Sequence, residues 1–181
     1  MLEYCLIATA IGPVGLAWSE TGLIRLQLPD ADGTRTLARL TRRLEAEEGH
    51  PPTWLEPTVK RLQQYFTGSK VDFRDEPLDF AGVPEFHARL YRQMLGLAWG
   101  ETVTYGELAE RVGSPGAAQS VGQAMGKNPI PVIVPCHRVL ASGNKVGGFS
   151  APGGIETKLR LLEMEGVRLG ARNPAQMAFA F

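Results

Sequence analysis

The sequence contains few cysteines and no excess of charge, and both shortages limit what the protein can be. Only Cys5 and Cys136 occur in 181 residues, which is too few for a disulfide framework. Nineteen Lys and Arg balance nineteen Asp and Glu, so any binding to nucleic acid must come from local contacts rather than from a global field. No apolar run has the length of a signal peptide or a membrane span, which predicts a cytoplasmic protein with no membrane partner.

Residues 2–28 predict a small antiparallel sheet. Apolar and polar positions alternate there, with turn-forming Gly, Pro and Thr between the runs. The expected strands lie near residues 2–9, 14–19 and 23–28. Cys5 has apolar neighbours in the first of them and is expected to be a core residue.

Two amphipathic helices are expected after the sheet. The first covers residues 34–48, where Thr34 is a candidate N-cap and leucines recur on one face. The leucines of this face are Leu37, Leu40 and Leu44. The second helix begins at a capping box formed by Thr53 and Glu56, and it ends near Gly68.

No cluster of metal ligands is visible in the sequence. His50 and His87 are isolated, and no second cysteine lies near enough to complete a zinc site with Cys5. We therefore expect neither a metal nor another cofactor.

Residues 84–181 are expected to form a mainly helical C-terminal domain. An irregular, acidic linker over 70–83 is expected to join it to the N-terminal domain. Helices over about 84–98 and 154–165 carry apolar residues at helical spacing. The inward residues of the last helix are expected to be Ile155, Leu159 and Leu162. The predicted fold class is therefore α+β, with a small N-terminal α/β domain and its antiparallel sheet over 1–80, followed by the helical domain.

Two short helices in the C-terminal part predict a helix-turn-helix. Thr104 and Glu107 form a capping box for the first helix, which Gly113 ends. Ser114-Pro115 is expected to cap a second helix over 116–126. The outer face of this helix carries slim polar side chains that suit a close approach to a groove: Gln119, Ser120, Gln123 and Lys127. An ordinary helical hairpin is the alternative interpretation.

A cysteine lies directly beside a histidine in residues 128–139, a segment that also contains three prolines. The prolines exclude a regular helix, and the apolar residues 132–134 predict an extended, buried piece that ends at Cys136. A thiol attacks only as thiolate, and His137 and Arg138 could supply the base or positive charge that activates it. A buried, unreactive cysteine beside a core histidine is the alternative.

Three ordered motifs give the chain a family resemblance. Pro-Cys-His-Arg-Val occupies 135–139, Asn128-Pro129 precedes it, and Gly-Gly-Phe-Ser follows at 147–150. With these motifs, the run from Gly100 to Gly166 resembles the C-terminal half of O6-alkylguanine-DNA alkyltransferases, whereas the N-terminal half resembles them only in general shape. These repair proteins move an alkyl group from guanine onto their own cysteine. The resemblance implies a self-inactivating methylated-DNA–protein-cysteine methyltransferase, an enzyme consumed by a single transfer.

The resemblance also implies roles for individual residues. Cys136 would attack the alkyl carbon, and His137 would take the thiol proton while Glu165 orients the imidazole. Tyr105 would donate to the departing base, and Asn128 would hold the turn that precedes the cysteine. The residues expected to contact DNA or the guanine are Gln119, Ser120, Gln123, Lys127, Arg138, Val139 (through its backbone), Phe149 and Ser150.

The implied partner is double-stranded DNA with an alkylated guanine. A monomer would contact its minor groove through the helix over 116–126 and would flip the damaged base out of the duplex. Gln119 stands where family members have an intercalating arginine, and this departure is expected to weaken duplex binding. Three alternatives stay open: a non-catalytic sensor of alkylation damage, a cysteine hydrolase, and a plain helix-turn-helix regulator. The apolar tail over 167–181 is expected to dock on the body of the protein or on another copy.

Overall fold

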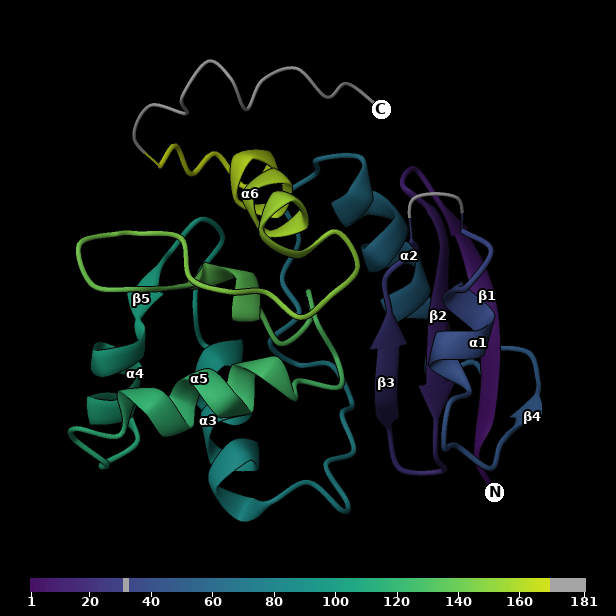
Figure 1. The fold of residues 1–181 in the computed structure, drawn as a ribbon. Helices are drawn as coiled ribbons and strands as arrows, with labels where there is room; N and C mark the ends of the chain where they lie inside the picture. The colour runs from purple at the N-terminus through teal and green to yellow at the C-terminus, as the bar shows by residue number, and fades with distance from the viewer. Residues whose placement is uncertain (31–32, 170–181) are drawn as a thin grey trace.

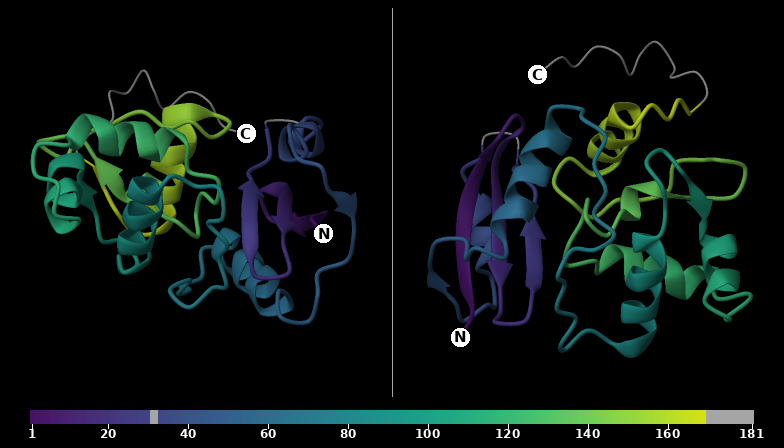
Figure 2. Two further views of the ribbon diagram at one scale, coloured as in Figure 1. Left: turned by 90° about the horizontal axis from the view of Figure 1, so that it is seen from below. Right: turned by 180° about the vertical axis from the view of Figure 1, so that it is seen from behind.

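The structure is a computed structural model that describes residues 1–30 and 33–169. A sheet with two helices forms the N-terminal part, and the remaining helices gather beside it (Figure 1). The views from below and from behind show the same two parts side by side (Figure 2). The α+β class is therefore confirmed. The predicted docking of the tail falls almost entirely outside the described residues.

Four strands form the N-terminal sheet, in the order β3-β2-β1-β4. Three of them are consecutive and antiparallel, as predicted: β1 (Glu3–Thr9), β2 (Gly12–Trp18) and β3 (Leu23–Gln27). Residues 14–18 of β2 are all buried, so both faces of this strand are covered. Cys5 is buried in β1, and this burial raises the pKa of its thiol to about 11, which is the environment of an unreactive core residue.

The predicted helix over 34–48 is wrong over most of its length. Helix α1 covers only Thr36–Leu40, and Thr34 does not cap it. The chain then turns through Arg43, whose φ is 55°, and the two residues of β4 (Glu47–Glu48) pair with the free edge of β1. The leucine spacing predicted a helix through these residues, but the edge of β1 offered unpaired backbone N–H and C=O groups, and the chain paired with them instead. Leu37, expected inside, is 40% exposed.

Helix α2 (Glu56–Phe66) ends close to the predicted place, but it begins without the predicted cap. Leu55 is the N-cap residue and no side chain caps the helix, so the capping box of Thr53 and Glu56 is absent. Leu55, Leu62 and Phe66 are buried and face the sheet side of the core.

The C-terminal part contains four helices and a two-stranded parallel sheet among its described residues. They are α3 (Glu85–Leu95), α4 (Tyr105–Arg111), α5 (Ala118–Gly126), α6 (Gly154–Met164), β5 (Val103–Thr104) and β6 (Val139–Leu140). The capping box of α4 is confirmed, because Thr104 accepts from the Glu107 amide and the Glu107 carboxylate accepts from the Thr104 amide. Helix α5 begins later than predicted and takes no cap from Ser114. In α6, Ile155 is 51% exposed rather than inward.

The linker over 70–83 is irregular, as predicted, but one of its residues pairs with a strand of the sheet. Leu23 of β3 pairs with Leu78, and the Leu26 amide donates to the Pro129 carbonyl across the two parts (2.9 Å). One continuous hydrophobic cluster runs from the sheet into the helical part. We retain the boundaries 1–80 and 84–181 as a proposal. Within the described ranges, no helix is long and apolar enough to cross a membrane.

Candidate active site

A tight turn, not an extended segment, presents Cys136. The Asn128 amide oxygen accepts from the Ile130 amide (3.0 Å), and its amide nitrogen donates to the Val134 carbonyl (2.8 Å). Val132 sits inside this turn with a φ of 76°, a conformation that β-branched residues rarely adopt. The extended piece predicted over 132–134 is therefore wrong. The Asn128 side chain closes this loop through its two hydrogen bonds, and the prolines on both sides lack the backbone N–H groups that strand pairing needs.

Cys136 begins a single 3₁₀ turn, Cys136–Arg138. Successive side chains of a 3₁₀ helix point about 120° apart, so the three residues face different surroundings. Cys136 is 5% exposed and lies where two cavities meet.

The first cavity, of about 410 Å³, separates α5 from the loop over 147–150. It brings together Cys136 and three residues predicted for the site, which are Tyr105, Phe149 and Ser150. Gly147 lies beside the Tyr105 ring, where a Cβ atom would come within 2.7 Å of the phenol oxygen. A flat, apolar group could enter this cavity and meet the sulfur.

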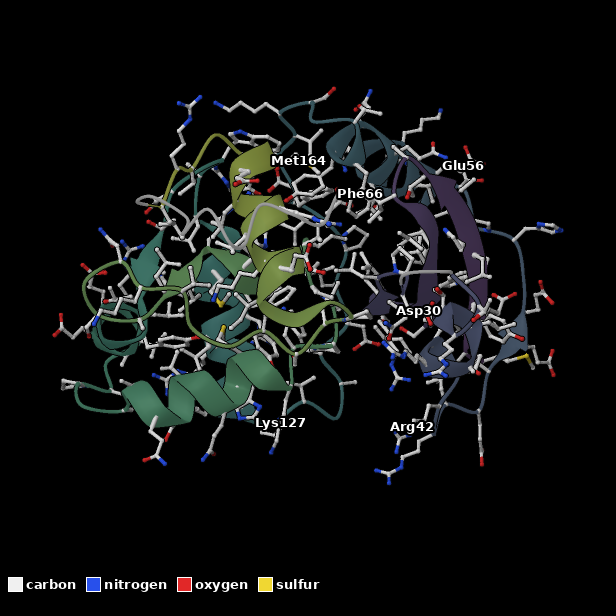
Figure 3. The ribbon with its side chains drawn as sticks, turned by 45° about the horizontal axis from the view of Figure 1, so that its top comes forward. Asp30, Arg42, Glu56, Phe66, Lys127 and Met164 are labelled. Carbon is white, nitrogen blue, oxygen red and sulfur yellow. The ribbon has the colours of Figure 1, made fainter. Side chains whose placement is uncertain are left out.

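The second cavity, of about 680 Å³, is a groove between the two parts of the chain. Asn128 and Phe149 line it on one side, and arginines of the N-terminal part line it on the other. These arginines are Arg25, Arg39, Arg42 and Arg43. Arg42 and Lys127 both extend toward the lower edge of the view in Figure 3.

The Cys136 thiol is opposed by burial and supported by its neighbours. Burial raises its pKa, and four groups favour the thiolate in return. These groups are the Asn128 side chain, the Lys158 ammonium, and the backbone amides of Cys136 and His137. Burial outweighs these groups, so the pKa of the thiol stays above its ordinary value and the attack requires a base that takes the proton.

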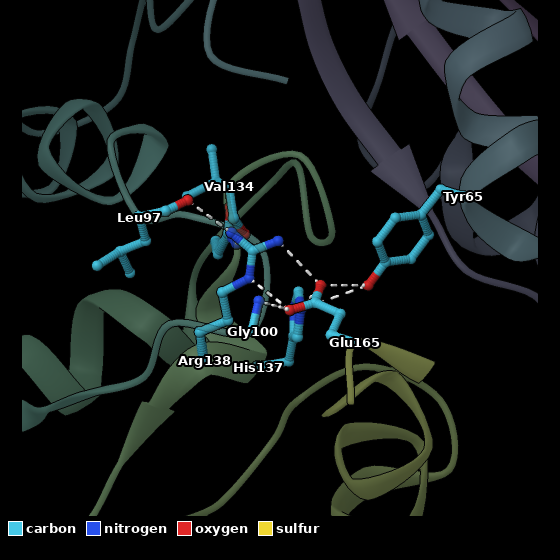
Figure 4. A network of polar contacts seen from close by, with 8 residues as sticks. Tyr65, Leu97, Gly100, Val134, His137, Arg138 and Glu165 are labelled. Atoms are coloured by element: carbon cyan, nitrogen blue, oxygen red, sulfur yellow. Dashed lines mark hydrogen bonds and ion pairs between the residues drawn. The ribbon is translucent and has the colours of Figure 1, made fainter. Parts of the chain in front are cut away.

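A buried hydrogen-bond network surrounds the Glu165 carboxylate (Figure 4). His137 Nε2 is 2.7 Å from Glu165 Oε1, as expected from the sequence, and both side chains are fully buried. His137 Nδ1 has no hydrogen-bond partner among the described residues. Burial alone would raise the pKa of Glu165, but hydrogen bonds from His137 and Arg138 hold it well below its ordinary value. Burial lowers the pKa of His137, although Glu165 counteracts this effect.

The structure does not place Arg138 where the sequence predicted a contact with DNA. Arg138 is buried and donates from Nε to Glu165 Oε2 (2.7 Å), from Nη2 to Oε1 (2.9 Å) and from Nη1 to the Leu97 carbonyl (2.8 Å). The 3₁₀ turn directs it inward, so its charge neutralises Glu165 rather than a phosphate. The side chain of Val139 is buried in β6, and its carbonyl accepts from Lys158 Nζ, so the predicted contact of its backbone with the guanine stays a prediction.

Sequence reasoning missed two residues of this region. Lys158 is fully buried in α6 and donates to the Val139 carbonyl (2.6 Å), and burial lowers its pKa to about 8. It precedes Glu165 by seven residues, two helical turns, so helical spacing could have placed both on one face. Tyr65 reaches Glu165 from α2, and no local signal could have revealed that contact.

The predicted DNA-contacting side chains of α5 lie on the surface. The exposed residues are Gln119, Ser120, Gln123 and Lys127, and the opposite side of the helix packs inward through Val121, Ala124 and Met125. Helices α4 and α5 pack together as the two halves of a helix-turn-helix. In residues 1–30 and 33–169, no three His, Cys, Asp or Glu side chains gather as a metal site would require.

A buried cysteine beside a helix-turn-helix, backed by a histidine–glutamate pair, defines the class of DNA-binding proteins that carry a nucleophilic cysteine. The chain belongs, within that class, to the 6-O-methylguanine DNA methyltransferase family. The ribonuclease-like domain of this family matches residues 2–80, and its DNA-binding domain matches residues 85–167. The N-terminal half, which resembled the family only in shape, therefore matches it too.

Similar proteins cover nearly the whole chain. The methylated-DNA–protein-cysteine methyltransferase of Mycobacterium tuberculosis is 37% identical over 174 residues, 94% of this chain and 96% of that protein. The protein of the same name from Mycobacterium leprae is 47% identical over 161 residues, 86% of this chain and 87% of that one. Among solved structures, M. tuberculosis OGT in complex with DNA has a TM-score of 0.73 at 37% identity, covering 90% of this chain and 92% of that chain. The O6-methylguanine-DNA methyltransferase of Pyrococcus kodakaraensis has a TM-score of 0.68 at 27% identity, covering 92% and 100%.

Proposed function

We propose that the protein repairs DNA by transferring the methyl group of O6-methylguanine irreversibly to the thiol of Cys136. The observation that carries this proposal is the position of the sulfur, at the inner end of a cavity that opens beside the helix-turn-helix. A thioether product has no bond that water readily hydrolyses, so each molecule would act once. Membership of the family supports both the reaction and double-stranded DNA as the partner.

The thiol must lose its proton as the S–C bond forms. His137 is the proposed acceptor, directly or through a water, because Glu165 occupies Nε2 and leaves Nδ1 without a protein partner among the described residues. Glu165, paired with Arg138, stays ionised and stabilises the imidazolium that forms. This is the nucleophile–base–orienter arrangement of hydrolytic triads.

The C–O6 bond breaks as the S–C bond forms, and its electron pair passes to the guanine. Tyr105 lines the cavity at Cys136, and burial raises the pKa of its phenol, so it keeps a proton to donate. A donor at this place lowers the cost of negative charge on the departing base. We assign the wall of the pocket to Phe149 and recognition of the guanine edge to Ser150.

The outer face of α5 is the proposed contact with the minor groove. Its polar side chains and the small residues Gly122 and Gly126 at the cavity allow a close approach to the duplex. Base flipping costs a few kcal/mol, and Gln119 is the residue in position to fill the vacated stack. Action as a monomer and a cytoplasmic location stay predictions.

Stoichiometry of alkyl transfer tests the proposal. The protein is incubated with a duplex that contains O6-methylguanine, and the Cys136 peptide is analysed by mass spectrometry. We expect one methyl group per molecule, on Cys136 alone, and none in Cys136→Ala. Tight binding without a methyl increment would indicate the damage sensor, and turnover of a model ester beyond one equivalent would indicate a hydrolase.

A further inference from the structure

Tyr65 reaches from the N-terminal part of the chain into the network around the Glu165 carboxylate. It lies on α2, which approaches α6 from the sheet side, and it is fully buried (Figures 1 and 4). Its hydroxyl donates to Glu165 Oε1 at 2.8 Å and lies 3.4 Å from His137 Nε2. Tyr65 is thus the residue of α2 that touches the histidine–glutamate pair.

The phenol can act here only as a donor. Burial and the neighbouring Glu165 carboxylate raise the pKa of Tyr65 well above its ordinary value, so the O–H proton is retained. Glu165 Oε1 consequently accepts from Tyr65, from His137 Nε2 and from Arg138 Nη2 (2.9 Å). The same oxygen therefore decides which ring nitrogen of His137 carries the proton.

Aromatic packing holds the hydroxyl in place. The Tyr65 ring meets Phe66 and Trp99 edge to face, with centroids 5.3 and 5.5 Å apart, and it meets Phe73 at 5.8 Å. A tyrosine has only two rotatable side-chain angles, and this cage restricts both. The donor is therefore preorganised by residues of α2, the linker and the segment after α3.

We propose that Tyr65 is a positioning residue for alkyl transfer, supplied by the N-terminal domain to the active site of the C-terminal domain. By fixing Glu165 Oε1, it keeps the proton of His137 on Nε2 and the lone pair on Nδ1, where the thiol proton is taken. This inference rests on the proposed function. It gives the N-terminal domain a part in the chemistry beyond that of a scaffold.

The inference predicts a change in pH dependence. The groups that face His137 are Glu165 and Lys158 from the α6 region, Arg138 from its own turn, and Tyr65 from α2. Without the phenol donor, the Glu165 carboxylate accepts one hydrogen bond fewer. More of its negative charge is then left to stabilise the protonated imidazole of His137. His137 would then become inactive as a base at a higher pH, so the acidic limb of the rate profile would move upward.

Tyr65→Phe removes the donor and keeps the packing, so it is the first variant to measure. Two rates are followed against pH in the folded protein. The first is methyl transfer from the alkylated duplex, and the second is alkylation of Cys136 by iodoacetamide, measured on the peptide that contains this residue. We expect transfer to slow by about tenfold, the scale of one hydrogen bond to a charged group, and both acidic limbs to shift upward. Tyr91→Phe is the matched control, because Tyr91 is also buried and its hydroxyl donates to the Ala124 carbonyl (2.7 Å), away from Glu165.

A second substitution keeps the test decisive if Tyr65→Phe does not fold. Site-specific 3-fluorotyrosine at position 65 keeps the shape and makes the phenol a stronger donor, so the acidic limb should move downward. The inference would be overturned if the acidic limb of the rate profile did not move in Tyr65→Phe or in the 3-fluorotyrosine protein, provided that the protein is folded. An equal shift of the limb in Tyr91→Phe would overturn it as well. A wild-type protein that transfers no methyl group would instead contradict the proposed function.

Discussion

Burial raises the pKa of the Cys136 thiol, yet the groups around the sulfur all favour the thiolate. Lys158 is the only full positive charge among them. It is itself buried, its own pKa is lowered to about 8, and Cys136 opposes that lowering. The two residues therefore support each other's ionised forms, and each would be neutral more often without the other.

Lys158→Met tests this mutual support at the level of one side chain. Methionine fills a similar volume but removes both the charge and the hydrogen bond to the Val139 carbonyl. We expect the pKa of Cys136 to rise further, and methyl transfer at neutral pH to slow by about tenfold. The rate of iodoacetamide alkylation at Cys136 against pH measures the shift. Lys60→Met, on the exposed side of α2, should leave both rates unchanged, and an unaltered thiol in Lys158→Met would contradict the pairing.

The site residues divide according to whether their signal was local. Cys136 and His137 are adjacent in the sequence, and the family resemblance supplied the role of Glu165. Arg138 was misassigned because a 3₁₀ turn, which the sequence did not indicate, points its side chain inward. Tyr65 lies one hundred residues from Glu165, so only the packing of the two parts of the chain reveals it.

Elements with self-sufficient local signals were predicted, and elements decided by tertiary pairing were not. Helix α4 was recognised because its capping box satisfies two backbone amides within four residues. Helix α1 was overextended because the edge of β1 claimed Glu47 and Glu48. The turn before Cys136 was missed because it places Val132 in the left-handed region, against that residue's own preference.

Helix α5 presents Gln119 to solvent, at the position where the resemblance led us to expect an arginine. Gln119→Arg adds a charged, planar group that can stack in the gap left by a flipped base. We expect tighter duplex binding and faster repair than in the wild type, with no change in reaction with free O6-benzylguanine. Gln123→Arg adds the same charge one turn further along the exposed face. Equal gains in both variants would show that charge alone is responsible, and no gain in Gln119→Arg would discard the idea.

At the scale of the whole molecule, the polar network and the hydrophobic core both cross between the two parts of the chain. Tyr65 of α2 and Arg138 of the cysteine turn meet on one carboxylate, Glu165. The apolar cluster around them runs from the sheet to α6. Any change that moves α2 relative to α6 therefore disturbs the base that serves the nucleophile, so stability and reactivity depend on the same contacts.

Glu165 consequently links the stability of the whole molecule to pH. Its pKa is lower in the folded state than in the unfolded state, so its contribution is present above about pH 4.3 and is lost as the pH falls through the folded value. His137, whose pKa is lowered by burial, adds a loss of stability that begins below about pH 6.5. Removing the carboxylate should abolish the first dependence and retain the second.

Glu165→Gln leaves the buried Arg138 without its counter-charge, which should cost about 3 kcal/mol in the free energy of unfolding near neutral pH. Urea unfolding at a series of pH values measures how this cost changes. The difference from wild type should shrink as the pH falls below about 4, because the carboxylate is then protonated in the unfolded chain, whereas the folded protein keeps it ionised to a much lower pH. Glu45→Gln, in an exposed loop, serves as the control and should follow the wild type throughout. A difference in Glu165→Gln that stays constant down to strongly acidic pH would mean that Glu165 does not carry the charge that joins the two parts.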